Sequence, residues 1–279
     1  MDTEEQILER FLEDMDNNRL ILPTLPEVAL RVRDEVEKEN CNAADIAKIV
    51  GTDVALSARL LQVCNSPLYR TRMPVENIQT AIARLGNLQV RNLVSSLVMQ
   101  QMFQATSDVL DKRMRQSWEH STNVAAISYV LAAAAGIPKD QAMLAGLIHD
   151  IGALPIIVHA EEMPELRDDA ALLDKVIKKL HCIIGERILK SWEFPDSLVK
   201  VAAQHENLDR DPGDDEEVDY VDVVIVANLQ SYIGTNHPYT KMDWTTIPAF
   251  HRIGIEPEIN IVDIEENQEQ LQEVRAMLG

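Results

Sequence analysis

The chain has 279 residues, of which 46% are apolar, and its 46 acidic and 26 basic side chains give a formal net charge of −20. This composition is typical of a folded chain with a sizeable core and excludes a disordered one. The negative charge and the few aromatic rings (3 Trp, 5 Tyr and 4 Phe) argue against nucleic acid or anionic lipid as general partners, since these ligands attract clustered cations and stacking rings.

Cysteine usage and apolar runs indicate the cellular setting. Cys41, Cys64 and Cys182 form no Cys-x-x-Cys pair, so neither a disulfide framework nor a thiolate zinc site is expected. The N-terminus lacks the apolar core of a secretory signal, and the longest apolar stretch, residues 142–158, is shorter than the roughly 20 residues of a membrane helix. We therefore expect a cytoplasmic chain without a membrane anchor.

Apolar residues recur at helical spacing along almost the whole chain. Within residues 1–17, an apolar stripe predicts an amphipathic helix that docks on the body of the protein or on a partner, the body being the more usual case; its residues are Ile7, Leu8, Phe11, Leu12 and Met15. Similar patterns cover residues 28–36, 78–85 and 93–102. The run 221–226 could form a strand, but its continuation through residue 229 favours a buried helix. The predicted fold is all-α and multi-helical.

Charge and histidine content divide the chain. Residues 1–119 carry 14 basic and 18 acidic groups and no histidine, whereas residues 120–279 carry 12 basic and 28 acidic groups and all seven histidines. This predicts a helical subdomain over 18–105 and an acidic one over 106–279 that ends in a helical tail. Residues 207–220 form an acidic loop without the EF-hand calcium pattern, which predicts a solvated connector.

The strongest chemical signal is the pair His149-Asp150 at the end of a buried apolar run. Such a pair is costly to bury unless both groups are partnered or hold a metal ion. His120, His181 and His205 stand on neighbouring predicted helices and could complete such a site. Imidazole and carboxylate suit zinc, iron or manganese. From these residues alone, a metal site and a structural polar network are equally open.

The remaining histidines and the cysteine beside His181 carry weaker signals. His159, His237 and His251 lie in segments that are interrupted by proline or lack an apolar stripe. Successive helical residues do not face each other, so we expect no dyad between His181 and Cys182.

Several motifs occur in a fixed order: LPTLP at 22–26, AKIVGTD at 47–53, LLQVCNS at 60–66, AIARLG at 81–86, WEHS at 118–121, LAGLIHDIG at 144–152, HCIIG at 181–185 and SWEFP at 191–195. Together they resemble the HDOD family, the HD-related output domain of bacterial signalling proteins and a relative of HD metal-dependent phosphohydrolases. The resemblance covers roughly residues 18 to 260. It implies an HD-like helical bundle packed on an N-terminal helical subdomain.

The resemblance also implies a site for one or two divalent metal ions, Fe, Mn, Zn or Mg, bridged by Asp150. By position, His120 and His149 match ligands of a first metal that Asp150 shares, and His181 and His205 match ligands of a second.

Two positions depart from the catalytic pattern of HD hydrolases. Gln204 stands where a second histidine would precede His205, and Asn228 stands where an aspartate would lie. Either amide could still donate an oxygen to a metal. Ala153 stands where cyclic-dinucleotide enzymes have a phosphate-contacting lysine.

These departures favour a non-catalytic signal-transduction or scaffold module that acts through protein partners and retains a metal ion. The alternative is a metal-dependent phosphohydrolase acting on a nucleotide or cyclic dinucleotide. A weaker hypothesis is nucleotide or nucleic-acid sensing by the basic segment 41–104, through Arg59, Arg70, Arg72, Arg84 and Arg91. A solvated helical face accounts for these arginines more simply, so nucleic acid is not an expected partner.

Overall fold

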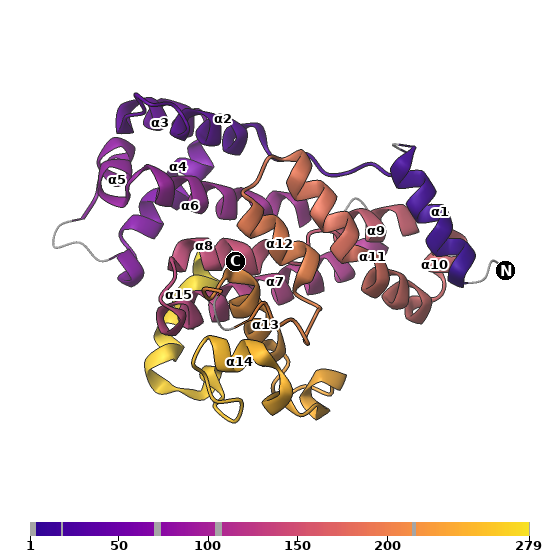
Figure 1. Cartoon of the computed structure of the whole chain (residues 1–279). Coiled ribbons are helices and arrows are strands. Elements are labelled where there is room, and N and C mark those ends of the chain that lie inside the picture. The colour runs from indigo at the N-terminus through magenta and orange to yellow at the C-terminus, as the bar shows by residue number, and fades with distance from the viewer. Residues whose placement is uncertain (1–3, 18, 70–73, 104–107, 214–215, 279) are drawn as a thin grey trace.

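The structure is a computed structural model, and it describes residues 4–17, 19–69, 74–103, 108–213 and 216–278. All regular elements within these ranges are helices, with no strand among them (Figure 1). The prediction of an all-α fold is therefore confirmed.

The N-terminal helices are α1 Glu4–Asp16, α2 Glu27–Val36, α3 Ala43–Val50, α4 Val54–Cys64, α5 Ile78–Leu85 and α6 Asn87–Met99. The later ones are α7 Asp108–Ala135, α8 Lys139–Ile148, α9 Ala153–Ala160, α10 Pro164–Arg167, α11 Ala170–Ser191, α12 Asp196–Gln204, α13 Tyr220–Ser231, α14 Pro248–Arg252 and α15 Glu265–Leu278. Short 3₁₀ turns cover Pro67–Tyr69, Gln100–Phe103, Pro238–Lys241, Trp244–Thr246 and Ile261–Asp263.

Helices α2 to α6 gather at one end of the molecule, at the upper left of Figure 1. Helix α6 packs against both α2 and α8 and so joins this end to the rest. In the remainder, α7 packs along α8, α13 and α15, and α11 packs against α9 and α12. The predicted division near residue 105 falls outside the described residues and stays a prediction.

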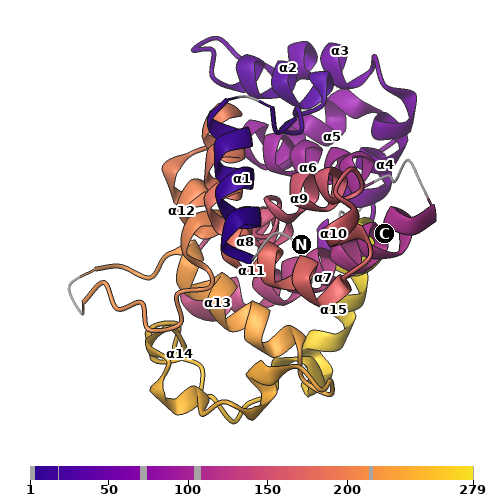
Figure 2. The same cartoon turned by 90° about the vertical axis from the view of Figure 1, so that its right-hand side faces the viewer.

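The N-terminal helix docks on the body, as its apolar stripe predicts. Ile7, Phe11 and Met15 are buried, and α1 packs on α11 (Figures 1 and 2). The ring edge of Phe11 meets His159, with the two ring centroids 5.2 Å apart. His159 therefore contributes to the packing of α1 and is not part of the histidine cluster around Asp150.

One apolar stretch is longer than the sequence indicates. Helices α8 and α9 with the turn between them form a run over Lys139–Ala160 that, by length and composition alone, could span a membrane. However, 83% of its most apolar window is buried inside the fold, as in the core helix of a soluble protein. Cys41, Cys64 and Cys182 are all free thiols, in keeping with the expected absence of a disulfide framework.

The 221–226 run is part of the buried helix α13, as predicted, and this helix begins at a buried ion-pair network. Asp222 is fully buried and accepts hydrogen bonds from Arg210 Nη1 at 2.7 Å and Arg252 Nε at 3.0 Å. Asp219 caps the helix, and Asp222 completes the capping box. Arg252 also donates to the carbonyl of Gly213. Among its described residues the loop 207–220 is exposed or half-buried, as expected of a solvated connector, but Arg210 from within it and Arg252 from outside it fasten the loop to the start of α13.

Replacing Asp222 with alanine should lower the free energy of unfolding by about 3–5 kcal/mol, because it removes the fully buried carboxylate that Arg210 and Arg252 share and leaves Arg252 without a carboxylate partner. Asp174→Ala is the matched control. It removes an ion pair to Arg113 of the same 2.7 Å length, but with a carboxylate side chain that is 66% exposed. That control should cost less than about 1 kcal/mol. Urea unfolding of both variants checks the contrast, and equal losses would contradict it.

Candidate metal centre

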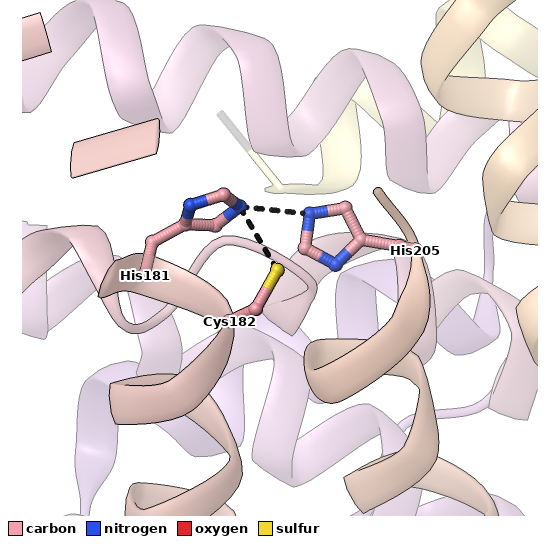
Figure 3. Close-up of side chains that lie close together, drawn as sticks. All are labelled: His181, Cys182 and His205. Atoms are coloured by element: carbon pink, nitrogen blue, oxygen red, sulfur yellow. Dashed lines mark hydrogen bonds between the residues drawn. The ribbon is translucent and has the colours of Figure 1, made fainter. Parts of the chain in front are cut away.

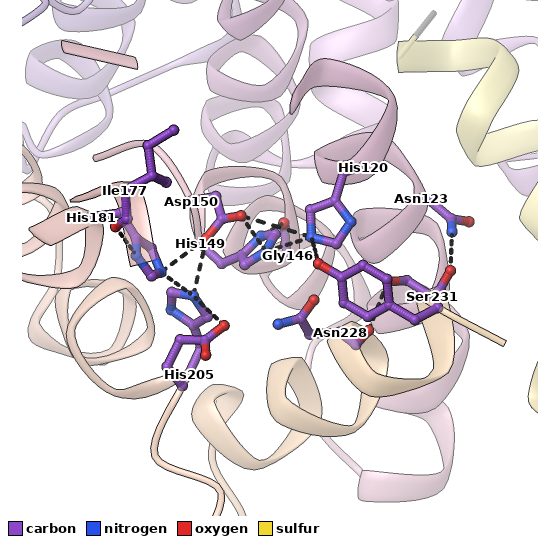
Figure 4. A network of polar contacts seen from close by, with 12 residues as sticks. His120, Asn123, Gly146, His149, Asp150, Ile177, His181, His205, Asn228 and Ser231 are labelled. Atoms are coloured by element: carbon purple, nitrogen blue, oxygen red, sulfur yellow. Dashed lines mark hydrogen bonds and ion pairs between the residues drawn. The ribbon is translucent and has the colours of Figure 1, made fainter. Parts of the chain in front are cut away.

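Five side chains from four helical segments converge beside the C-terminal end of α8 (Figure 4). His149 caps that helix and Asp150 follows it. His120 projects from α7 and His181 from α11, and His205 caps the C-terminus of α12. His149 and His205 are fully buried, and His181 is 4% exposed.

The carboxylate of Asp150 lies between two pairs of imidazoles. Its Oδ1 is 3.1 Å from Nε2 of His205 and 3.4 Å from Nε2 of His181. Its Oδ2 is 3.4 Å from Nε2 of His149 and 3.8 Å from Nε2 of His120. Each oxygen thus faces one pair of nitrogens, which is the arrangement of a carboxylate that can bridge two cations.

The backbone fixes which nitrogen of each ring faces the carboxylate. Nδ1 of His149 lies 2.7 Å from the Gly146 carbonyl, Nδ1 of His181 lies 2.8 Å from the Ile177 carbonyl, and Nδ1 of His205 lies 3.0 Å from the Val201 carbonyl. A carbonyl only accepts, so Nδ1 carries the proton and donates it. In the neutral ring, Nε2 then presents a lone pair toward Asp150, as metal-binding histidines do.

The spacing of these lone pairs fits a cation. Nε2 of His120 and Nε2 of His149 are 3.3 Å apart, and Nε2 of His181 and Nε2 of His205 are 3.2 Å apart. Lone pairs this close repel unless a proton or a metal ion lies between them. Two imidazoles that share a tetrahedral ion at about 2.0–2.1 Å have nitrogens roughly 3.3–3.4 Å apart. The residues present therefore fit a metal.

The charge states also suit a cation. Burial lowers the pKa of His149 to about 3 and also lowers the pKa of His120, so both rings are neutral near pH 7. Burial opposes ionisation of Asp150, but the surrounding histidines outweigh it and hold the pKa of that carboxyl well below its usual range. Burial likewise opposes charge on His205, but its hydrogen bond to Asp150 raises the pKa of that ring. Burial opposes charge on His181 too, but its contacts with Cys182 and Asp150 raise the pKa of that ring to about 9. The first pair is therefore neutral, whereas the second pair holds a proton near pH 7 that a metal ion would displace.

Cys182 joins the second pair, which the sequence reasoning missed. Its Sγ lies 3.4 Å from Nε2 of His181 (Figure 3), so the expectation that these neighbours do not face each other is wrong. The contact forms because the ring of His181, anchored through Nδ1 at Ile177, directs Nε2 toward the next side chain. Thiolate is a good ligand for soft metals, so the second group offers three donors, on His181, Cys182 and His205.

Gln204 and Asn228, the two amides that could supply a metal ligand, have different surroundings. The Gln204 oxygen accepts a hydrogen bond from Arg210 Nε at 3.1 Å, and no hydrogen bond joins Gln204 to the five central residues. Asn228 projects from α13 beside His120 (Figure 4). Its Oδ1 is buried and has no hydrogen-bond partner among the described residues, so it remains free to act as a ligand.

A cleft leads from solvent to Asp150 and His181, and it encloses ≈770 Å³, including open solvent at its mouth. Its other walls come from residues that the sequence reasoning did not select: Lys178, Glu206, Tyr232, His237 and Tyr239. Tyr232 OH lies 3.4 Å from Nε2 of His120, and Tyr232 stacks on His237 with ring centroids 3.7 Å apart. Tyr232 follows Asn228 by one helical turn, which is the signal that could have found it.

An all-helical chain in which a His-Asp pair gathers histidines from three other helices has the organisation of an HD-type protein. The chain belongs to the HDOD family, since the model of the HDOD domain matches residues 22–208. Among curated proteins, an uncharacterised protein of Treponema pallidum (strain Nichols) is 26% identical over 253 residues. That match covers 85% of this chain but 47% of the relative, so the chain spans about half of the relative's length.

Solved structures resemble the whole chain. A candidate metal-dependent phosphohydrolase from Shewanella amazonensis is 29% identical, with a TM-score of 0.84 and full coverage of both chains. An HDOD domain protein of unknown function from Geobacter sulfurreducens is 20% identical, with a TM-score of 0.65, over 98% of this chain and 96% of its own. The second likeness shows the fold alone.

Proposed function

We propose that this chain is a metal-binding, non-catalytic signal-transduction module of the HDOD type that acts in the cytoplasm through contacts with protein partners. The observation that carries the proposal is the position of Asp150, with one pair of imidazole Nε2 atoms at each oxygen. These nitrogen-rich donors favour Fe, Mn or Zn over Mg.

Each half of the centre has its own donor set. His120, His149 and Asp150 would hold one metal with the Asn228 oxygen nearby, and His181, His205 and the Cys182 sulfur would hold another. A bound ion would supply Lewis acidity and would cross-link helices that are far apart in the sequence. Because metal binding to a folded site adds to folding stability, such an ion would rigidify the module.

The cleft that opens onto the centre is poorly suited to an anionic substrate. Among the described residues its lining carries Asp150, Asp174 and Glu206 against one lysine, Lys178, and the imidazoles of His181 and His237. Tyr239 donates a hydrogen bond to Glu206, which keeps that carboxylate at the wall. Ala153, at the position that resembles a phosphate-contacting lysine, is buried in α9. Hydrolysis of a phosphodiester needs cationic stabilisation at the phosphate, which these residues provide only weakly.

A turnover assay tests this proposal. The purified chain, supplied with Mn²⁺, Fe²⁺ or Mg²⁺, is expected to hydrolyse neither cyclic dinucleotides, nor nucleoside phosphates, nor a generic phosphodiester faster than its His149→Ala variant. Turnover by the wild type that disappears in His149→Ala would contradict the proposal.

The second candidate function is a metal-dependent phosphohydrolase. The open cleft at Asp150 and the 29% identity to the Shewanella protein favour it. In that case Lys178→Met should lower turnover of a phosphodiester, since Lys178 is the one lysine or arginine among the described residues that line the cleft. A non-catalytic module has no turnover for this substitution to change.

A further inference from the structure

A second cleft lies where the N-terminal helices meet the rest of the molecule. It encloses ≈620 Å³, including open solvent at its mouth, and its walls come from α2, α6, α8, α12 and the turn before α12. This volume lies within the range of small-molecule sites. None of the five central residues lines it, so it is separate from the metal centre.

The polar wall of this cleft comes from one face of α6. Arg91 is half-buried and makes no ion pair or hydrogen bond with any described residue. Asn92 is 4% exposed and Ser95 is 6% exposed, and both line the cleft. Neither side chain hydrogen-bonds to a described residue. The polar atoms of Asn92 and Ser95 are not shut off from solvent, so water or a ligand in the cleft can hydrogen-bond to them. A guanidinium, an amide and a hydroxyl on one wall of the cleft, none of them bonded to a described side chain, indicate a place for a ligand.

The other arginine of the cleft is already neutralised. Arg33 of α2 donates to the carbonyl of Trp192 and pairs with Glu193 at 3.1 Å and Asp34 at 2.9 Å. Glu193 has a φ of 54°, which makes it the one non-glycine residue with a positive φ in the described part of the chain. Such strain persists where the surroundings enforce it, and these contacts fasten the turn before α12 to α2. Arg91 therefore remains as the cation of the cleft without an ion-pair contact, and the exposed carboxylate of Glu37, which also lines the cleft, attracts it only from a longer distance.

Another arginine of the basic segment 41–104, Arg59, does not present a comparable site. Arg59 donates to the Gln100 side chain at 2.9 Å and reaches the Met277 carbonyl of α15 at 3.3 Å, so it ties helices together. Arg70 and Arg72 lie outside the described residues.

The opposite walls are apolar. They are formed by Leu25, Leu144, Phe194 and Leu198, with Phe194 half-buried at the turn. A ligand that satisfies every wall needs one anionic group for Arg91, hydrogen-bonding atoms for Asn92 and Ser95, and an apolar body for Phe194 and the leucines. A guanidinium recognises carboxylate and phosphate oxygens alike, through a pair of parallel hydrogen bonds.

We propose that this cleft binds a small organic oxyanion, a carboxylate or a phosphate ester with an apolar ring. Arg91 holds the oxyanion, Asn92 and Ser95 hydrogen-bond to it, and the ring lies against Phe194. Such a ligand touches both α6 and the turn before α12, so it strengthens the docking of the N-terminal helices on the half that contains the metal centre. This ligand site goes beyond the proposed function and does not depend on a bound metal.

Isothermal titration of the full chain with benzoate and with phenyl phosphate tests the proposal and separates the two oxyanions. At least one of them should bind saturably with one site per chain. Benzyl alcohol lacks the anion and inorganic phosphate lacks the ring, so both should bind more weakly than the better aromatic anion. If neither aromatic anion saturates the wild type, the proposal is overturned.

Variants then locate the site. Arg91→Met should weaken binding by about 10- to 100-fold, the value of a hydrogen-bonded charge pair, and Arg91→Lys by less. Ser95→Ala should weaken binding by a smaller factor. This variant tests the same site if Arg91→Met does not fold. Arg31→Met, exposed on α2, should bind as the wild type does. Unchanged affinity in both Arg91→Met and Ser95→Ala, or an equal loss of binding in Arg31→Met, would overturn the proposal.

Discussion

Alanine at position 152 is expected to destabilise the protein strongly. A Cβ atom there would lie 2.0 Å from the His181 carbonyl oxygen and 2.5 Å from the Gly185 backbone nitrogen. Both are backbone atoms, so relief requires α11 to move away from the turn that carries Asp150. Overpacking of a core typically lowers the free energy of unfolding by about 1–3 kcal/mol. Because this clash is with backbone atoms, we expect a loss of about 3 kcal/mol or more. Chemical denaturation of Gly152→Ala measures the loss.

Gly185→Ala is the matched control on the other side of the same contact. Its Cβ would meet the Ala202 methyl at 3.3 Å and the Gly152 nitrogen at 3.5 Å, which small shifts can accommodate. Alanine is also a better helix former than glycine inside α11, by roughly 1 kcal/mol. The control should therefore be nearly neutral. Equal destabilisation by the two substitutions would mean that the close approach at Gly152 is not what limits the packing.

The second large effect concerns Asp150. Because a ligand that binds only the folded state stabilises it, Zn²⁺ or Mn²⁺ at a hundred times its dissociation constant should add about 2.7 kcal/mol and raise the Tm of the wild type. Asp150→Asn removes the negative charge that both pairs of imidazoles share. We expect this variant to lose most of the metal-dependent rise in Tm, as followed by thermal melts with and without added metal.

His251→Ala is the control for that experiment. His251 is exposed on α14 and lines a different cleft from the one at Asp150. Its loss should leave the metal-dependent rise in Tm intact. A rise of the same size in Asp150→Asn as in the wild type would show that the metal binds elsewhere.

The helical class and the core of the site could be predicted from local signals. Apolar spacing of the helical period and prolines between the segments indicate the helices, and a carboxylate beside an imidazole in a buried run is too costly to lack partners. The structure brings His120, His181 and His205 to the pair His149-Asp150 from three other segments.

What could not be predicted depends on side-chain direction and long-range packing. Whether Cys182 meets His181 is decided by the carbonyl that anchors the ring, and the fate of Gln204 is decided by an arginine six residues away. In the sequence, Asp222 cannot be distinguished from the acidic residues that precede it. Its partner Arg252 lies thirty residues later in the chain, and only the fold brings the two together.

The cleft walls illustrate the same limit. Tyr232 caps the C-terminus of α13, whereas His237 and Tyr239 lie at the following 3₁₀ turn. The rings of Tyr232 and His237 stack face to face at the mouth. His237 seemed a weak candidate because a proline follows it, yet that proline begins the turn that places the ring over Tyr232.

The metal content of the wild-type chain tests the central claim most directly. The protein is purified without chelator, incubated with Fe²⁺, Mn²⁺ or Zn²⁺, desalted and measured by mass spectrometry of its metals. The arrangement of Asp150 between two pairs of histidines predicts one or two tightly held transition-metal ions per chain. A chain that keeps only trace metal after this treatment would contradict the account.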